Sequence, residues 1–181
     1  NEQASRAMIE SEIGGGQYWQ HNYDPYDPFS IADAHAPIPA SLNGMIESGE
    51  AAPILLHQGT IYPQGRIQSV TLKGIPTDQS ILNLPTGDLQ DDGAIPALIG
   101  TRMAKSAHLR KGDFLTLRWR DKHGAFDAAE IEIQQIMNTT VQSVDQGQIW
   151  LPLETLEAMT GFENQASIVV VDQNVENVPN A

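Results

Sequence analysis

Residues 98–119 read LIGTRMAKSAHLRKGDFLTLRW, and this stretch shows the kind of unit from which the fold is built. Its first part predicts a strand end and a short amphipathic helix near 101–107. The helix runs into a turn at Gly112 and Asp113, and a strand with alternating apolar residues leaves that turn at once. The stretch has no pattern of a nucleophile, a metal ligand or a phosphate-binding loop, so we expect a structural role for it.

Composition excludes several classes of function. The chain has 181 residues, 40% of them hydrophobic and 6% aromatic, as in an ordinary globular protein of one domain or two small lobes. Its formal charge of −13 repels phosphates and anionic lipids, so a nucleic acid interface is not expected. The absence of cysteine excludes disulfides and thiolate metal sites. No apolar run approaches the roughly 20 residues that span a bilayer.

The remaining sequence alternates between strand and helix patterns. Apolar spacing predicts helices at 39–48, ended by Gly49, and at 152–160, ended by Gly161. Strands are expected at 17–23, 53–60, 66–75, 94–100, 113–120, 126–137 and 166–171. Residues 121–124 carry the signal of a hairpin turn. The apolar phase then slips between Ile133 and Ile136, which indicates a bulge or a strand that crosses between lobes.

This order predicts an α+β protein with two lobes. Without residues 77–148 the elements follow the order βαββαβ, which is the ferredoxin-like split βαβ arrangement. We therefore expect a discontinuous ferredoxin-like lobe from 14–76 plus 149–172. A small α/β lobe, 77–148, is inserted between its third strand and its second helix. Residues 1–13 begin with a helical pattern, and 173–181 form a polar tail, as in a piece of a longer polypeptide.

Catalytic or metal-binding chemistry has weak support in the sequence. Asp24 and Asp27 could act as an acid and base pair in a hydrolase, although aspartate before proline is far more often a turn former. The five histidines show no ligand spacing. The acidic segment 88–92 only faintly resembles a calcium loop. We therefore expect no enzyme activity, no cofactor and no metal site.

One exposed contact point is predicted at the tip between the strands 53–60 and 66–75. This tip consists of Tyr62, Pro63, Gln64 and Gly65. Turn tips with an aromatic residue and a proline are common contact points for partner proteins, while a plain hairpin loop explains the same residues. Both interpretations of the tip stay open.

Four motifs in order resemble the extracytoplasmic domain of MacB/LolC/LolE-type ABC transporter permeases. They lie in GQYWQHNYDPYDP, SVTLKGIP, ALIGTRMAKSAHLRKGDFLTLRW and VDQGQIWLPLETLEAMTG. The residues that match the family pattern are Gly74, Ile75, Ile99, Gly100, Ala104, Leu109, Gly112, Asp113, Asp145, Pro152 and Leu153. The match runs from about Gly14 to Val171, nearly the whole chain.

The resemblance implies a periplasmic domain inserted between the first and second membrane helices of a permease. In such a domain the ferredoxin-like lobe is called the porter lobe and the inserted lobe the sabre lobe. Residues 1–13 would be the outer end of the first membrane or stalk helix, and 173–181 would lead to the next membrane segment. The domain would be non-catalytic and would transmit ATP-driven conformational change to move or release a substrate, a mode called mechanotransmission.

The resemblance also implies partners. These are a second permease subunit in a homo- or heterodimer, a cytoplasmic ATPase subunit reached through the membrane part, and a periplasmic or outer-membrane partner. The isolated fragment would be monomeric. The loop at 121–125 is too short to serve as the carrier-gripping hairpin of LolC members, which argues against a lipoprotein carrier. The alternatives are a free-standing exported ligand-binding protein with a groove between its lobes and, less favoured, a carboxylate-dependent hydrolase.

Overall fold

The long strand β3, Ala51–Ile61, takes part in two sections of one sheet and organises the fold. The computed structural model describes residues 16–19, 35–138 and 147–172. The other strands are β1 Gly16–Trp19, β2 Ala36–Pro37, β4 Gln68–Ile75, β5 Ile95–Gly100, β6 Phe114–Arg120, β7 Phe126–Met137, β8 Gln148–Pro152, β9 Gln165–Ala166 and β10 Ile168–Val171. The helices are α2 Asn43–Ser48, α3 Thr101–Ser106 and α5 Leu153–Thr160, with 3-10 turns η3 Ala40–Leu42, η4 Pro63–Gly65 and η5 Thr86–Asp88.

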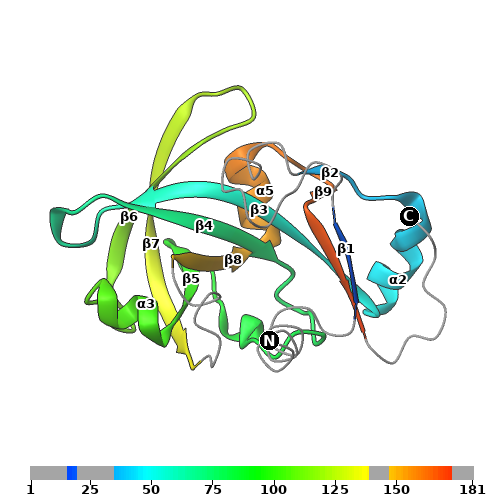
Figure 1. The fold of residues 1–181 in the computed structure, drawn as a ribbon, viewed down its shortest axis with the longest axis horizontal. Coiled ribbons are helices and arrows are strands. Elements are labelled where there is room, and N and C mark those ends of the chain that lie inside the picture. The colour runs from blue at the N-terminus through cyan, green and yellow to red at the C-terminus, as the bar shows by residue number, and fades with distance from the viewer. Residues whose placement is uncertain (1–15, 20–34, 139–146, 173–181) are drawn as a thin grey trace, which may run out of the picture.

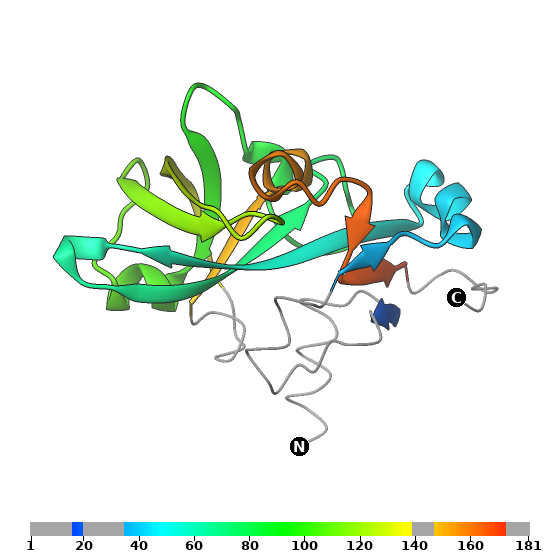
Figure 2. The ribbon, with the colours of Figure 1, turned by 90° about the horizontal axis from the view of Figure 1, so that it is seen from above.

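Six of these strands close into a ring. Its order is β3, β4, β8, β5, β7, β6 and back to β3. The pairs β4–β8 and β5–β7 are parallel, and the other pairs are antiparallel. Ring closure gives each of these strands two hydrogen-bonded neighbours. Figure 1 shows the β3–β4 hairpin running along the long axis of the molecule, and Figure 2 shows the same hairpin from above.

The first residues of β3 lie outside the ring and carry a small antiparallel extension. Ala51 to Ile54 pair with β10, and β10 pairs in turn with β1 at the edge of the sheet. Gly16, the first residue of β1, is opposite Val171, the last residue of β10. The described chain therefore enters and leaves the sheet at neighbouring points.

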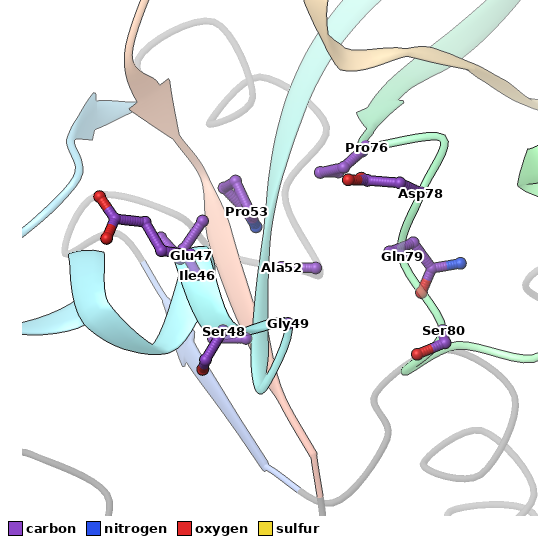
Figure 3. Close-up of a pocket in the computed structure, with 11 residues that line it drawn as sticks. Ile46, Glu47, Ser48, Gly49, Ala52, Pro53, Pro76, Asp78, Gln79 and Ser80 are labelled. Carbon is purple, nitrogen blue, oxygen red and sulfur yellow. The ribbon is translucent and has the colours of Figure 1, made fainter.

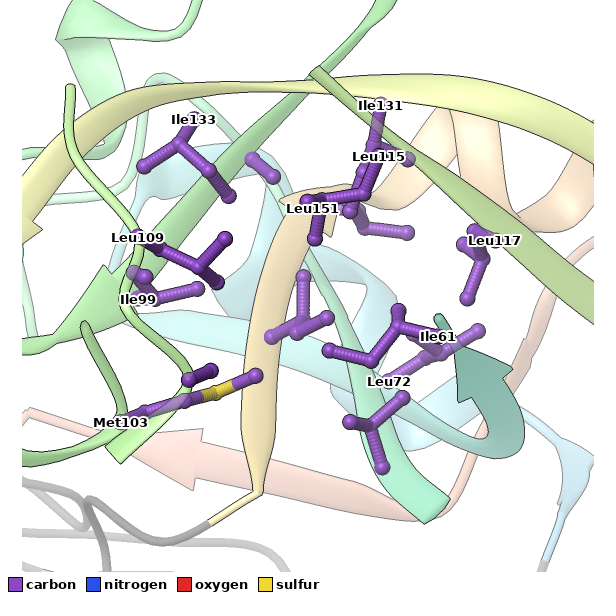
Figure 4. Packing of buried hydrophobic residues seen from close by; sticks show 14 of the residues in the cluster. Ile61, Leu72, Ile99, Met103, Leu109, Leu115, Leu117, Ile131, Ile133 and Leu151 are labelled. Carbon is purple, nitrogen blue, oxygen red and sulfur yellow. The ribbon is translucent and has the colours of Figure 1, made fainter. Parts of the chain in front are cut away.

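The main core fills the ring. Alternate residues of each strand point inward, as Figure 4 shows for Leu72, Leu117, Ile131 and Leu151. Helix α3 adds Met103 and Ala104 to this cluster, and α5 adds the fully buried Leu156. Side chains on the other face of β3, β4 and β8 form a second cluster beneath residues 81–89, which includes Leu56, Ile75, Leu89 and Trp150. No helix of the described residues is long and apolar enough to cross a membrane.

Several local predictions are confirmed. The helix expected at 39–48 is η3 followed by α2, and it ends at Gly49 with φ of 82°. The hairpin predicted at 121–124 joins β6 to β7, and it places Leu115 and Leu117 opposite Ile131 and Ala129. The phase slip in β7 is a bulge: Ala97 pairs with Ile133 and Leu98 with Gln135, so that Gln134 is the additional residue.

The mixed α+β class is confirmed, but the strand order differs from the expected ferredoxin-like arrangement. In that arrangement β4 would separate β1 from β3, whereas β10 lies between them here. Strands of the expected inserted lobe, 77–148, also pair with strands outside it: β6 with β3 and β5 with β8. The reason is the length of β3, which offers backbone groups to β10 at one end and to β4 and β6 at the other.

Candidate functional site

The predicted contact tip, residues 62–65, lies between β3 and β4 at one end of the long axis (Figure 1). The turn is tight, because Gln64 has φ of 53° and the N–H of Arg66 donates to the carbonyl of Pro63 at 3.0 Å. Tyr62 is half-buried and Pro63 is buried, while Gln64 and Gly65 are exposed. The exposed part of the tip is therefore limited to residues 64 and 65.

An exposed apolar residue two positions after the tip was not predicted from the sequence motifs. Ile67 is 77% exposed, the largest value among the exposed large apolar side chains of the described residues. The apolar residues of β4 that face the core are Val70 and Leu72, at even positions, so Ile67 is out of phase with them. Ile75 shares the odd phase and is fully buried in the second cluster, so periodicity alone does not distinguish the exposed Ile67 from a buried residue.

A shallow hollow lies between the tip at 62–65 and the helix-turn-strand segment 98–119. We call it the distal hollow, and its lining residues are Gln64, Ala104, Lys105, His108, Leu109, Arg110 and Asp113. Gln64 comes from the β3–β4 tip, and the others come from α3 and the turn before β6. The structure thus places the predicted contact tip, 62–65, beside the helix-turn-strand segment, which lies some forty residues away in the chain.

The turn at Gly112 and Asp113 is held by four hydrogen bonds. The Asp113 carboxylate accepts from the N–H of Arg110 at 2.8 Å, and the N–H of Asp113 donates to the carbonyl of Arg110 at 3.1 Å. Two further bonds join the turn to Ile133 of β7, at 2.7 and 2.9 Å. Gly112 has φ of 90°, where a Cβ is unfavourable. The turn predicted at Gly112 and Asp113 is confirmed, and Asp113 holds it through the backbone of Arg110.

Helix α3 ends with an unusual residue in the hollow. His108 has φ of 54°, the left-handed region that glycine or asparagine usually occupies after a helix. This conformation lets the N–H of Leu109 donate to the carbonyl of Ala104 at 2.8 Å, which closes the helix. The His108 side chain is exposed, while Leu109 is buried beneath it. The turn therefore presents a polar rim over an apolar floor.

Positive charge gathers at this end of an acidic chain. Of the ten Lys and Arg residues, four lie within residues 93–112, and this segment contains no Asp or Glu. Lys105, Arg110 and Lys111 are exposed there. The Asp113 carboxylate at the edge of the hollow is engaged with a backbone N–H. The rim of the distal hollow is thus locally cationic, although the chain has a formal charge of −13.

Two of the four motifs quoted from the sequence meet in space. Ile75 is paired with Pro152 in the β4–β8 register. A Cβ on Gly74 would lie 3.3 Å from the Cα of Leu153 and 3.1 Å from the Cβ of Leu156, so α5 packs directly on the backbone of β4. The two motifs, more than seventy residues apart, form one rigid contact between sheet and helix. Asp145, from the same pattern, lies outside the described residues.

A second cavity, of about 270 Å³, lies between the end of α2 and residues 76–80 (Figure 3). It borders Ala51 to Pro53 of β3. These residues pair with β10 on one side only, because the pairing of β3 with β4 starts at Leu55. The carbonyls of Glu50 and Ile54 accept hydrogen bonds on the β10 side, so Pro53 directs its backbone toward the cavity. Proline lacks an N–H, and this short edge is therefore poorly suited to adding a further strand.

His57 is buried in β3, and its pKa is shifted by its surroundings. Its Nε2–H donates to the carbonyl of Arg120 at 2.6 Å, and its Nδ1 is buried without a partner. Burial lowers the pKa of His57 below its ordinary value, while the hydrogen bond to Arg120 raises it and His35 lowers it. The ring lies 6.0 Å from Phe162, which also stacks on His35 at 3.8 Å. His57 is therefore held by one backbone carbonyl, that of Arg120.

The described residues offer no grouped set of metal ligands. Among them, no three His, Cys, Asp or Glu side chains are grouped so that they could hold a metal ion. In the acidic segment 88–92, Asp88 accepts from Gln135 and Asp91 accepts from the N–H of Gly93. Asp24 and Asp27, the hydrolase candidates, lie outside the part of the chain that the structure describes.

Comparison with known proteins gives similarities in structure only. No family model matches the sequence, and no curated protein matches it. Two solved structures similar to this chain are an extracellular domain of an ABC-type transporter and the periplasmic region of MacB. Their sequence identities to this chain are 14% and 11%, so the role of each residue is argued from the geometry of this chain alone.

The first of these structures is the extracellular domain of the noncanonic ABC-type transporter YknZ from Gram-positive bacteria. It has 14% sequence identity and a TM-score of 0.48, over 88% of this chain and 83% of that one. The second is the periplasmic region of MacB from Actinobacillus actinomycetemcomitans. It has 11% identity and a TM-score of 0.47, over 76% of this chain and 66% of that one.

Proposed function

We propose that this chain is a non-catalytic extracytoplasmic domain of an ABC transporter permease, which transmits ATP-driven conformational change to move or release a substrate. The observation that carries the proposal is the pairing of Gly16 with Val171. It brings the incoming and outgoing chain together at one part of the sheet. The β3–β4 tip lies toward the other end of the long axis (Figure 1). A domain held at two neighbouring connectors and free at its tip has the geometry of a lever.

Strand β3 is the element that joins the two ends of this lever. Its first residues pair with β10 and its later residues with β4 and β6, without a break in the strand. Eleven residues of extended chain span roughly 36 Å at about 3.3 Å per residue. Because the strand has a partner on at least one side along its whole length, it resists bending better than a loop of the same length.

Helix α5 stiffens the same path. The indole N–H of Trp119 in β6 donates to the carbonyl of Met159 at 2.8 Å, and the N–H of Lys122 donates to the carbonyl of Thr160 at 2.8 Å. With the close contact at Gly74, these bonds join α5 to two different strands and to the β6–β7 hairpin. Displacement of the connectors would therefore move the ring as one body.

Each of the ranges predicted from the sequence would have a mechanical role in this lever. Residues 1–13 and 173–181 would connect to membrane segments. The range 14–76 with 149–172 would hold these connectors and reach the distal end through the β3–β4 tip, and 77–148 would build much of the rest of the distal part. A second permease subunit and a cytoplasmic ATPase would act through the membrane portion. A periplasmic or outer-membrane partner would contact the tip at residues 62–65. The domain would work at the periplasmic face of the inner membrane.

The test uses the absence of native cysteine in the chain. In the complete transporter, Gln64→Cys should react with a membrane-impermeant maleimide on intact cells. A spin label at this position in both permease subunits should then report an ATP-dependent change in distance. The matched control is Glu47→Cys on α2, also exposed but near the attached end. A lever predicts a smaller change at residue 47. Lack of labelling from outside, or equal distances with and without ATP, would refute the proposal.

A further inference from the structure

The geometry points to the distal hollow as a binding site for a short acidic segment of a partner protein. This inference rests on the proposed function, which leaves the tip end free for a partner, and it names the chemistry of that partner. The hollow combines residues from two parts of the chain, Gln64 from the tip and the rest from α3 and its turn. The tip alone was predicted as a contact point, and the basic half of the site was not.

Charge is the first argument for an acidic segment. Lys105 and Arg110 line the hollow, Lys111 is next to them in sequence, and all three are exposed. The carboxylate of Asp113 at the same edge already accepts a hydrogen bond from the backbone N–H of Arg110. Opposite charges within about 8 Å still attract at physiological ionic strength. A carboxylate of a partner would therefore find cations at this rim.

The shape of the hollow favours a narrow segment. Ala104 and Leu109 are buried beneath the rim, so the floor offers small apolar contacts. Gln64 on one side and His108 on the other are exposed side chains that can donate or accept hydrogen bonds. Interface cores generally combine such an apolar floor with a polar rim. One extended peptide segment can make both kinds of contact, whereas a flat surface can reach only the rim.

The charge of the whole chain argues against a membrane or a nucleic acid as the occupant. Both are extended polyanions, and they would bring negative charge against the rest of a chain with a formal charge of −13. The outer face of β7, in the same hairpin as β6, exposes Glu130 and carries Glu132. A short segment places its carboxylates only at the basic rim and avoids this repulsion. An acidic protein segment is therefore the occupant that the charges favour.

Fluorescence anisotropy tests the inference with the full chain. The probe is a fluorescein-labelled short peptide of alternating Glu and Ser, and the comparison peptide has Gln in place of Glu. We expect the Glu peptide to bind, and its binding should weaken as the salt concentration is raised. The double substitution Lys105→Glu and Arg110→Glu should lower its affinity at least about tenfold. In an NMR titration, amide shifts should be confined to residue 64 and residues 104–113.

A charge-matched control distinguishes a local site from general attraction. The pair Arg118→Glu and Lys122→Glu changes the net charge equally, and both residues are exposed in the β6–β7 hairpin, outside the hollow. This pair should change affinity by less than about twofold. Equal losses from both pairs would overturn the inference. The milder pair Lys105→Gln and Arg110→Gln, with thermal unfolding measured for each variant, separates loss of binding from loss of folding.

Two other results would also overturn it. One is binding of the Gln peptide as tightly as the Glu peptide, because charge would then play no part. The other is binding of phosphatidylglycerol vesicles, lost with Lys105→Glu and Arg110→Glu, without binding of the Glu peptide. If peptide binding fails while the spin label at residue 64 still moves with ATP, the partner chemistry is wrong and the proposed lever stands. If that label does not move, the lever fails whatever the peptide does.

Discussion

Gly16 lies directly opposite Val171 in the antiparallel pair of β1 and β10, so the first and last strands of the described fold are neighbours. The same β10 pairs with Ala51 to Ile54 of β3. A displacement applied at the connectors would therefore pass across two rows of backbone hydrogen bonds into the strand that runs to the tip. This relationship gives the lever proposal its physical basis, and it leads to the first prediction.

A disulfide should form between cysteines at positions 16 and 171. Cα atoms opposed in an antiparallel pair are about 4.5–5.5 Å apart, within the range that a disulfide spans. We expect Gly16→Cys with Val171→Cys to oxidise readily, seen on a non-reducing gel, and to raise the free energy of unfolding by about 2–4 kcal/mol. The control pair is Gly16→Cys with Val169→Cys, which is a diagonal pair about 7–8 Å apart. Equally rapid oxidation of this pair would contradict the register.

Gly59 in β3 should not tolerate a side chain. A Cβ at this position would lie 2.9 Å from Cδ1 of Leu117 and 3.3 Å from the carbonyl oxygen of Arg118. Gly59→Ala should therefore lower the free energy of unfolding by about 1–3 kcal/mol, measured by urea denaturation. Adding Leu117→Val should return part of this loss, because it shortens the side chain that the new methyl group meets.

The matched glycine for this experiment is Gly44 in α2. A Cβ there would meet no atom within 4 Å, and the backbone is helical. Gly44→Ala should raise the free energy of unfolding by about 0.5–1 kcal/mol, since alanine has the better helix propensity. Effects of opposite sign at the two glycines would support close packing in the ring. A neutral Gly59→Ala would show that the ring is looser than the structure indicates.

Acid should destabilise the fold through His57. Burial lowers its pKa in the folded state, so below the ordinary value of about 6.5 the unfolded chain binds more protons than the folded chain. The free energy of unfolding should then fall as pH falls from about 7 to about 5.5, and rise again on return. His57→Gln should flatten this dependence in chemical denaturation at several pH values.

His123→Gln is the control for this prediction, because His123 is exposed in the 121–124 turn. It should keep the pH dependence of the unchanged protein. If His57→Gln retains the full loss of stability at low pH, other groups titrate and the burial of His57 is not the cause.

The bulge residue Gln134 should hold the loop before β5. Its side chain accepts from the backbone N–H of Gln90 at 2.7 Å and donates to the carbonyl of the same residue at 2.6 Å. Gln134→Ala removes both bonds, and the amide of Gln90 should exchange with solvent about tenfold faster, a loss of about 1.4 kcal/mol. Gln134→Glu keeps the acceptor and loses the donor, so its effect should be smaller at the Gln90 amide. Unchanged exchange in both variants would contradict this role.

Local structure could be predicted where one feature of the sequence decides it. The alternation in 113–120 and 126–137 gave two strands and the register of Leu115 with Ile131, because the short turn between them leaves little freedom. The slip between Ile133 and Ile136 showed the bulge. The tip at 62–65 was found as a turn, but the burial of Pro63 was not, because burial depends on what packs against the tip.

The order of strands around the ring could not be predicted in the same way. Nothing local distinguishes β10 from β4 as the neighbour of Ala51 to Ile54, since both are apolar strands of suitable length. The choice depends on which faces are buried together across distances of more than a hundred residues. For the same reason, no local pattern predicts that Gln64 and Lys105 line one hollow.

The sequence by itself determined the strands, the helix ends at glycines, the hairpin turns and the concentration of basic residues at 93–112. These depend on side-chain periodicity, on backbone preferences and on composition, all of which are local. Only the tertiary structure decided the closed ring, the neighbouring entry and exit of the chain, and the basic hollow beside the tip. These arise from pairing between distant strands, where a strand's neighbours are selected by the hydrophobic surface that the whole chain buries.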